Sequence, residues 1–356
     1  IERAGDPILL NDRLSADARS ADLNARSAAA EQLNQLFGEP GDQQGLFASL
    51  TRFETALDDL ATTPESGSYQ GAALRAAQDL TGTFNRLGDA VTDARTEADR
   101  AIGTSVGEVN RALKALEELN GISGRGEANG LSDTAEQRQQ LIDVIAEALD
   151  IKVDDVGRGK INIMTAEGVL LLGESARTIE FSSGGIVAPG QTIASGHLSG
   201  LTVDGIDITP KGGAQGVRSG YLAAQFAIRD EVVPEFSSRI DDLAQDVVDR
   251  FTGPGVDGTL APGEEGLFIS NGTGDGIAAR ISVNSAVNPD EGGELWRLRD
   301  GINATVAGPS ASLGVIGGLL AAVDAPRALP SVTDSPAVLS LNEITAAFAS
   351  VVGTQR

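Results

Sequence analysis

The residue types best suited to catalysis are scarce in this sequence and do not form a recognisable set. The chain has one histidine, His197 in "ASGHLSG", and no cysteine. Imidazole is the usual general base near neutral pH, but no G-x-S-x-G nucleophile elbow accompanies His197. A loop between strands is therefore the favoured interpretation for His197, and zinc sites of the usual Cys/His kind are excluded.

Two glycine-rich stretches have the composition of ligand-binding loops. "GRGEANG" at 124–130 lacks the G-x-G-x-x-G spacing, a preceding strand and the Lys-Ser/Thr of a P-loop, so we predict a helix–helix corner. "NGTGDG" at 271–276 contains Asn271 and Asp275 but lacks the acidic spacing and closing Glu of an EF-hand. We interpret it as a surface turn, with a weak ion site as the alternative.

Neighbouring carboxylates could do acid–base work, but they carry little information here. The chain has 51 acidic residues, so pairs such as Asp241–Asp242 and Asp154–Asp155 arise by chance and are expected to face water. Trp296, in "LWRLRDG", is expected to anchor a core rather than to bind a sugar. We therefore predict no catalytic, cofactor-binding or metal-ligating residue, no cofactor and no enzymatic activity.

Composition narrows the remaining function classes. The chain has 356 residues, enough for roughly two or three domains, and a net charge of −24. Such an acidic surface repels phosphate backbones and anionic lipids, which disfavours binding to nucleic acid or to a membrane surface. No apolar run approaches the length of about 18 residues that a membrane-spanning helix needs. The opening "IERAGDPILLNDRLS" carries no secretory signal and begins in mid-pattern, so a fragment lacking its true ends is expected.

The dominant pattern is a long helical stripe between Tyr69 and Asn120. Its apolar residues recur at intervals of 3 and 4 and shift by one position after Ala101: Ala77, Leu80, Phe84, Leu87, Val91, Ala94, Ala98 and Ala101, then Ile102, Val106, Val109, Leu113 and Leu116. A helix over 69–120 would be about 78 Å long, so we predict a rod whose partner helices cover it along its length.

Shorter helical patterns and two β-type segments surround this stripe. Helices are predicted at 8–36 (with a small-residue seam Leu14, Ala18, Ala21, Ala25, Ala28), 46–60, 132–150, 215–252 (kinked or restarted at Pro234) and 336–356. From Ile151 apolar residues alternate with polar ones, which is typical of antiparallel strands, and weaker strand patterns follow residue 253.

These patterns together predict a multidomain α and β chain. Its fold class is an elongated, coiled-coil-like helical bundle with inserted antiparallel β lobes. Residues 1–150, 215–252 and 336–356 are expected to form a discontinuous helical rod domain. Residues 151–214 with 253–335 are expected to form the β-rich outer domain or domains.

Three stretches resemble a known family, the flagellar hook-associated protein 1 family. "LFASLTRFETALDDLATTP" resembles the family's "LF-x-x-L-x-x-F…AL-x-x-L-A-x-x-P" helix, and "GYLAAQFAIRDEVVP" is similar to its "G-x-L-x-[AG]-L-x-x-x-RD-x-x-[LI]-P" helix. Here Gly220, Arg229, Asp230 and Pro234 fit the second pattern. "EVNRALKALEELN" followed by "EQRQQLIDVIAEAL" resembles the family's "V-x-x-I-x-x-L-N" run and "D-x-R-x-x-L-[LI]-D-x-[LI]-[AS]" helix, through Glu136 or Gln137, Arg138, Leu141, Ile142, Asp143, Ile145 and Ala146.

The resemblance implies a mechanical role in the bacterial flagellum, outside the cell. It implies the first junction protein between hook and filament, exported by the flagellar type III pathway. The implied partners are further copies in a ring, hook protein, hook-associated protein 3 and an export chaperone that acts on a terminal segment, with neither nucleic acid nor membrane. The family's flagellin-like "N-N-[IL]-A-N-x-x-T-x-G-Y" segment and its matching terminal helix are not found in this sequence, which indicates a central core. Another axial protein (hook-associated protein 3 or flagellin) and a coiled-coil surface adhesin remain as alternatives.

Overall fold

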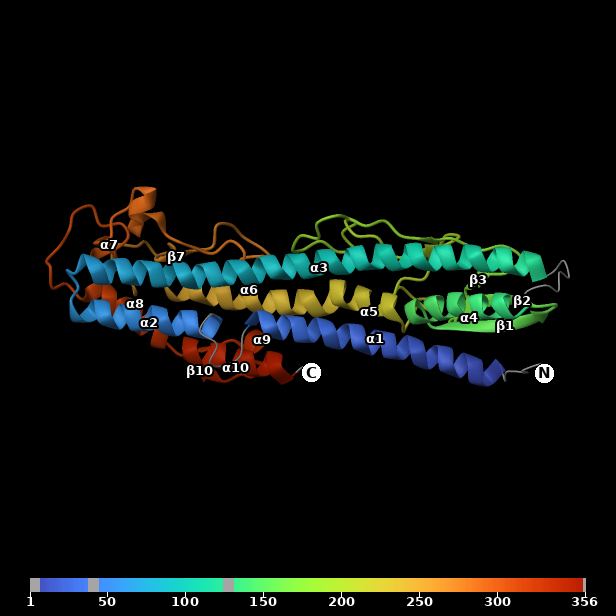
Figure 1. Ribbon diagram of the computed structural model, residues 1–356. Helices are drawn as coiled ribbons and strands as arrows, with labels where there is room; N and C mark the ends of the chain where they lie inside the picture. The colour runs from blue at the N-terminus through green and yellow to red at the C-terminus, as the bar shows by residue number, and fades with distance from the viewer. Residues whose placement is uncertain (1–6, 38–44, 124–130, 355–356) are drawn as a thin grey trace. The chain divides into compact units, whose positions relative to one another are not determined.

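The computed structural model describes residues 7–37, 45–123 and 131–354 (Figure 1). Long helices and small antiparallel sheets make up the chain, which confirms the predicted class of a helical bundle with β lobes. The chain divides into two compact units, Ile1–Ala29 with Thr92–Val233 (unit 1) and Ala30–Val91 with Pro234–Arg356 (unit 2). The predicted division into a helical rod domain and β-rich outer domains follows other boundaries and stays a prediction.

Helix α3 (Gly67–Ser123) contributes to both units and confirms the predicted long helix, with two or three further residues at each end. Its 57 residues correspond to a length of about 86 Å at 1.5 Å per residue. The predicted one-position shift of the apolar stripe is real, because Ala101 is only half-buried whereas Ile102 is completely buried. The stripe therefore rotates slowly around the helix, as expected when 3.6 residues per turn meet a seven-residue repeat.

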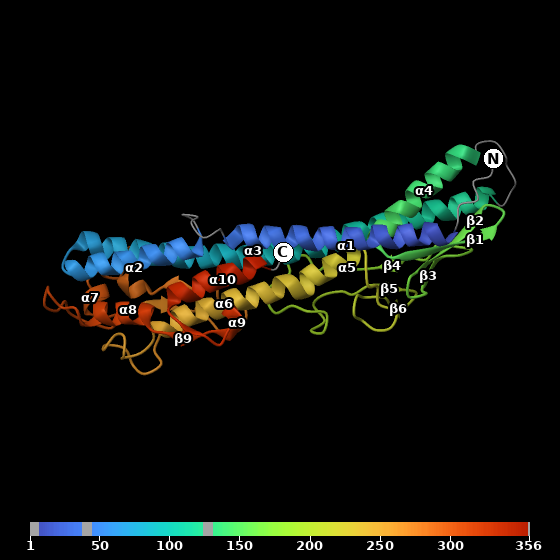
Figure 2. The ribbon, with the colours of Figure 1, turned by 90° about the horizontal axis from the view of Figure 1, so that it is seen from below.

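Unit 1 packs helices against two small sheets. Beside α3, its helices are the first part of α1 (Pro7–Phe37), α4 (Leu131–Ala148) and α5 (Tyr221–Ala227), which is followed by a π-helical turn (Ile228–Val232). One sheet consists of β1 (Ile151–Gly157), β2 (Lys160–Thr165) and β3 (Leu170–Leu172). The other sheet consists of β4 (Ile179–Glu180), β5 (Thr202–Val203) and β6 (Ile206–Asp207). Ile151 and Val153 of β1 are buried while Lys152 and Asp154 are exposed, which confirms the predicted switch to period two. Figure 2 shows these sheets beside the last part of α3.

Unit 2 is built around the first part of α3. Its other helices are α2 (Leu46–Thr62), α6 (Val233–Arg250), α7 (Arg297–Asp300), α8 (Gly314–Asp324), α9 (Pro330–Thr333) and α10 (Leu341–Thr354). It also contains the 3₁₀ turns Ser285–Val287 and Pro289–Glu291. Two strand pairs complete it: β7 (Phe268–Ile269) with β8 (Ser282–Val283), and β9 (Arg327–Ala328) with β10 (Val338–Leu339). Phe53, Phe251 and Phe268 form its aromatic centre, with T-shaped rings whose centroids are 5.0–5.9 Å apart. An aromatic cluster thus joins a helix, a helix end and a strand.

Several predicted boundaries were wrong. The helix expected from residue 215 begins at Tyr221, and the terminal helix expected from residue 336 begins at Leu341, after strand β10. The expected β-rich segment 253–335 contains the helix α8 in "GVIGGLLAAVD". A Cβ atom on Gly318 of this helix would lie 2.1 Å from the carbonyl oxygen of Val256, so the glycine serves close packing.

Two further expectations concern single features. Trp296 is half-buried rather than a core anchor, and the guanidinium of Arg297 lies 5.7 Å from its ring centroid. Pro234 does restart the helix, since it lies in the first turn of α6 directly after the π-helical turn. Because Pro234 has no N–H, it cannot donate to a carbonyl of the π-helical turn, and the donor just before it, the N–H of Val233, bonds the carbonyl oxygen of Ile228. The corner predicted at 124–130 lies outside the described residues.

Gly88 marks a close contact in unit 2 that a mutation can test. A Cβ atom there would lie 2.6 Å from the backbone nitrogen of Ala279, whereas at Gly82 the nearest atom is the Arg86 guanidinium at 3.9 Å. Both glycines lie within α3, where alanine is preferred over glycine by roughly 0.5–1 kcal/mol. We expect Gly82→Ala to raise the free energy of unfolding slightly and Gly88→Ala to lower it. Urea unfolding monitored by circular dichroism measures both; equal effects of the two variants would contradict the close packing.

Candidate functional site: the Arg229 cluster and a groove between α3, α4 and α5

Each described residue that the sequence offers for chemistry has its own local setting in the structure. His197 is exposed in a loop, as predicted, and its Nδ1 lies 2.9 Å from the Oγ of Ser195. Within the described ranges, no group of His, Asp and Glu side chains has the arrangement of a metal site. Also within these ranges, no helix has both the length and the apolar character needed to cross a bilayer.

The loop 271–276 binds a cationic group that belongs to the chain itself. The guanidinium of Arg280 donates to the carbonyl oxygens of Asp275 at 2.8 Å and Gly274 at 3.2 Å. Residues 271–275 are exposed, which agrees with the predicted surface turn. The oxygens that a bound ion would need are therefore partly used by Arg280.

Asp241 corrects the expectation that the adjacent carboxylates face water. Its side chain is partly buried and accepts hydrogen bonds from the backbone nitrogens of Gly276, at 2.7 Å, and Ala278, at 2.9 Å. Burial raises the pKa of Asp241 above its ordinary value, although the two N–H groups act in the opposite direction. The carboxylate thus fastens the loop to α6, and no signal near Asp241 in the sequence indicates this partner.

The most unusual polar group in unit 1 is Arg229, whose side chain is 0 % exposed. Its Nη1 donates to Asp99 Oδ1 at 2.7 Å, and its Nε and Nη2 each donate to the carboxylate of Asp230 at 2.8 Å. Nη2 also reaches the carbonyl oxygen of Ser199 at 3.3 Å, and the guanidinium lies 4.6 Å from the ring centroid of Phe226. A buried guanidinium is tolerated only when its donors are met in this way.

Burial alone lowers the pKa of Arg229, because it disfavours the charged form. The hydrogen bonds and negative charges of Asp230 and Asp99 more than compensate, so the pKa is raised above its ordinary value. Arg229 is therefore charged at neutral pH. The cluster is a permanent ionic centre and not a proton-transfer group.

Asp99 and Arg95 extend the cluster from α3 into the long loop after β4. Asp99 Oδ2 accepts from the Oγ of Ser183 at 2.6 Å and from the backbone nitrogen of Gly184 at 2.9 Å. One turn earlier, Arg95 donates to the carbonyl oxygens of Arg229, Ala188 and Gln191 at 2.6–2.9 Å. Two neighbouring turns of α3 thus hold the loop 183–191 and the π-helical turn together.

The backbone geometry at position 220 requires a glycine. It has φ of +102°, and a Cβ atom there would lie 2.5 Å from the carbonyl oxygen of Ala148 at the end of α4. Any other residue would be strained at this φ and would collide with α4. Gly220, Arg229, Asp230 and Pro234, which fit the sequence pattern identified above, therefore each have a distinct structural task.

Asparagine side chains attach the helices of unit 1 to its strands. The amide of Asn110 donates to the carbonyl oxygen of Ile179 and accepts from its N–H, both at 2.8 Å. Asn120 forms the same pair of bonds with Ile161, at 2.9 and 3.1 Å, and Asn11 with Val153, at 3.4 and 2.9 Å. Each amide thus takes the place of a neighbouring strand and satisfies backbone groups that would otherwise be left unpaired.

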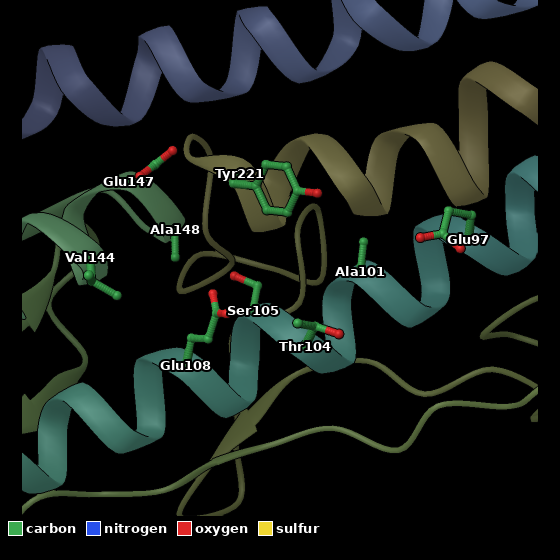
Figure 3. A pocket seen from close by; sticks show the side chains of 9 residues that line it. All are labelled: Glu97, Ala101, Thr104, Ser105, Glu108, Val144, Glu147, Ala148 and Tyr221. Carbon is green, nitrogen blue, oxygen red and sulfur yellow. The ribbon is translucent and has the colours of Figure 1, made fainter.

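A groove of about 420 Å³ lies between α3, α4 and α5 (Figure 3). Its nine lining residues are Glu97, Ala101, Thr104, Ser105, Glu108, Val144, Glu147, Ala148 and Tyr221. Burial and the charges of the three glutamates raise the pKa of the Tyr221 hydroxyl, so this group stays protonated and can donate a hydrogen bond. The groove can bind a group that combines apolar surface with positive charge.

Comparison with known proteins places these features in a family. The family described as "Flagellar hook-associated protein FlgK helical domain" matches residues 30–267, which are 238 of the 356 residues. The chain belongs to this family. The match includes α2, α3, α4, both sheets of unit 1 and the Arg229 cluster, so the resemblance inferred from three short stretches is confirmed.

Individual relatives agree with this assignment. Flagellar hook-associated protein 1 of Bacillus subtilis (strain 168) is 24 % identical over 316 residues, covering 79 % of this chain and 61 % of the relative. Flagellar hook-associated protein 1 of Salmonella typhimurium (strain LT2) is 24 % identical over 223 residues, covering 56 % of this chain and 40 % of the relative. The chain thus spans between two-fifths and three-fifths of the length of these relatives.

A solved structure shows the same fold. The flagellar hook junction protein FlgK from Burkholderia pseudomallei superimposes with a TM-score of 0.57 at 17 % identity, covering 73 % of this chain and 46 % of that chain. At this level of identity the likeness concerns the fold alone. The packing of long helices against small sheets is therefore shared by a protein of the same family.

Loss of the Arg229 guanidinium should be one of the most damaging single changes in unit 1. Arg229→Met leaves the carboxylate of Asp99, which is 0 % exposed, without its cation, and breaking a buried pair costs about 3–5 kcal/mol. The matched control is Arg100→Met on α3, next to Asp99, because Arg100 and its partner Glu97 are largely exposed and such surface pairs contribute little. Equilibrium denaturation compares the two variants. A similar small loss of stability for both would show that the cluster is not a stabilising centre.

The paired hydrogen bonds of Asn110, Asn120 and Asn11 described above, here called the asparagine clamps, allow a separate prediction. Asn110→Ala leaves the buried N–H and C=O of Ile179 without partners, and each such group costs about 1–3 kcal/mol. We expect the amide of Ile179 to exchange hydrogen for deuterium markedly faster. Asn24→Ala, on the exposed surface of α1, is the control and should leave that exchange unchanged. Unaltered protection of Ile179 in the first variant would contradict the clamp.

Proposed function

We propose that this chain is the central part of a first hook–filament junction protein, a structural component of the bacterial flagellum outside the cell. The observation that carries the proposal is the family match over 238 residues, which contains the buried Arg229 cluster and the helices α2 to α6. Relatives with 24 % identity are named flagellar hook-associated protein 1, and the matching solved structure is titled a flagellar hook junction protein. The match to this family favours the junction protein over hook-associated protein 3, flagellin or an adhesin.

The proposed role is mechanical and not enzymatic. A junction subunit must transmit torque and bending between neighbours, which requires side chains fixed by packing and ionic contacts rather than a reactive centre. The Arg229 cluster, the asparagine clamps and the aromatic centre of unit 2 supply contacts of this kind. The arrangement of helices as one discontinuous rod domain, with the β-rich segments as outer domains, is part of the proposal.

The proposed partners follow from the same role. We infer that full-length copies associate with one another in a ring, contact hook protein on one side and hook-associated protein 3 on the other, and leave the cell through the flagellar type III pathway. An export chaperone would bind a terminal segment and not the residues described above. Nucleic acid and membrane are not among the proposed partners, which fits a net charge of −24.

Deletion of the gene tests the proposal. Cells of the encoding organism that lack it should assemble hooks without filaments, should lose swimming motility and should release filament protein into the medium. The full-length gene should restore all three properties, and the Arg229→Met variant should restore less than the Arg100→Met variant does. Normal filaments on the deletion strain would overturn the proposal.

A further inference from the structure

The groove between α3, α4 and α5 has an unusual combination of linings. Its apolar lining comes from Ala101, Ala148 and Val144, and Val144 is 42 % exposed. Its rim carries Glu97, Glu108 and Glu147, and no basic residue is among the nine that line it. Figure 3 shows these carboxylates distributed along the groove around the ring of Tyr221. Glu97 is already paired with Arg100 on the same helix, so Glu108 and Glu147 are the lining carboxylates that would attract a cation into the groove.

The chemistry of this lining selects a long cationic side chain over a metal ion. Arginine and lysine bury an apolar stem and keep a charged end group in polar surroundings, which matches a groove lined by both apolar and acidic side chains. The tyrosine ring adds a π-face to which a cation is attracted. The described carboxylates do not form a group that could hold a metal ion.

One protruding part of unit 1 presents such side chains. The β1–β2 hairpin turns at Gly157, Arg158 and Gly159, whose φ values are +84°, +55° and +70°. Arg158 and Lys160 are exposed at this tip, beside Val156, which is 54 % exposed although apolar. The tip therefore combines two cations with an apolar side chain, while the exposed carboxylates of Asp154 and Asp155 lie just before it on β1, where Asp155 Oδ1 accepts from the backbone nitrogen of Gly157.

The hairpin cannot reach the groove of its own chain. The clamp between Asn120 and Ile161 fastens β2 to α3, and the clamp between Asn11 and Val153 fastens β1 to α1. Asn120 is 16 residues after Thr104 of the groove, which is about 24 Å along a helix. The tip extends from this anchor within the same unit, so only a different molecule can bring a tip into the groove.

We propose that the groove of one copy binds the hairpin tip 156–160 of a second copy. This inference rests on the proposed function, in which copies of the protein lie next to one another. Arg158 and Lys160 then pair with Glu108 and Glu147, while Val156 covers the exposed part of Val144. Because tip and groove are different surfaces, the contact is head-to-tail and can repeat from copy to copy.

The absence of cysteine from the chain makes cross-linking a direct test. Arg158→Cys in one sample and Thr104→Cys in another place single thiols at the tip and in the groove without removing a glutamate. On mixing and mild oxidation, we expect a disulfide-linked heterodimer at least ten times faster than with Glu118→Cys. That control places the thiol on an exposed position of α3 that does not line the groove. Peptide mass spectrometry identifies the linked residues.

Charge reversal shows whether the pairing is electrostatic. Adding Glu108→Lys and Glu147→Lys to the Thr104→Cys chain, or 0.5 M NaCl to the mixture, should lower the rate to that of the control. Equal rates with the groove and control thiols, or rates unchanged by charge reversal, would overturn the contact. A failed cross-link together with the expected deletion phenotype removes only this inference. A specific cross-link without that phenotype leaves the contact standing and removes the flagellar role.

Discussion

The ion pair between Arg229 and Asp99 is the interaction on which the rest of unit 1 depends. Removing both side chains from water costs several kcal/mol for each ion, and only well-placed partners compensate this cost. Those partners come from α3, from the π-helical turn and from the loop after β4, so all three segments must be in place together. A misplaced helix turn would leave a buried charge unpaired, which makes the cluster a strong determinant of register.

The sheets of unit 1 depend on the helices for a related reason. Strands β4, β5 and β6 have two residues each, too few to form a stable sheet in water on their own. Asn110 completes the hydrogen bonds of Ile179 in β4, and Asn120 completes those of Ile161 in β2. The β lobes are therefore extensions of α3, fixed at points where an amide of the helix replaces a missing strand.

Sequence periodicity predicted the elements that bury one continuous face. The stripe from Ala77 to Leu116, including its shift between Ala101 and Ile102, and the alternation that begins at Ile151 follow directly from burial on one side. The absence of a catalytic set was also an expectation from the sequence, because His197 lacks partners of the required kind nearby. Helical stripes and strand alternation can be recognised from the sequence because they involve only residues that are close together in it.

Features that depend on distant partners could not be predicted in this way. The glycine-rich segment 253–335 was expected to be β-rich and α8 was missed, because the carbonyl of Val256 that requires Gly318 lies more than sixty positions earlier in the chain. Asp241 was expected to face water, and its partners Gly276 and Ala278 are 35 and 37 positions away. Arg229 was noticed only through a family pattern, although a charged pair inside "YLAAQFAIRDEVV" is itself a sign of a buried ionic contact.

The charge of the chain places a further constraint on any assembly. A net charge of −24 makes copies repel one another at distances within which salt does not screen them. Association then requires local pairs of opposite charge, strong enough to act at contact and too few to attract copies in random orientations. The exposed Arg158 and Lys160 of the hairpin tip and the acidic groove, whose nine lining residues include no basic one, form the proposed pair of this kind. An acidic surface of this kind would keep copies apart except where such a pair aligns them.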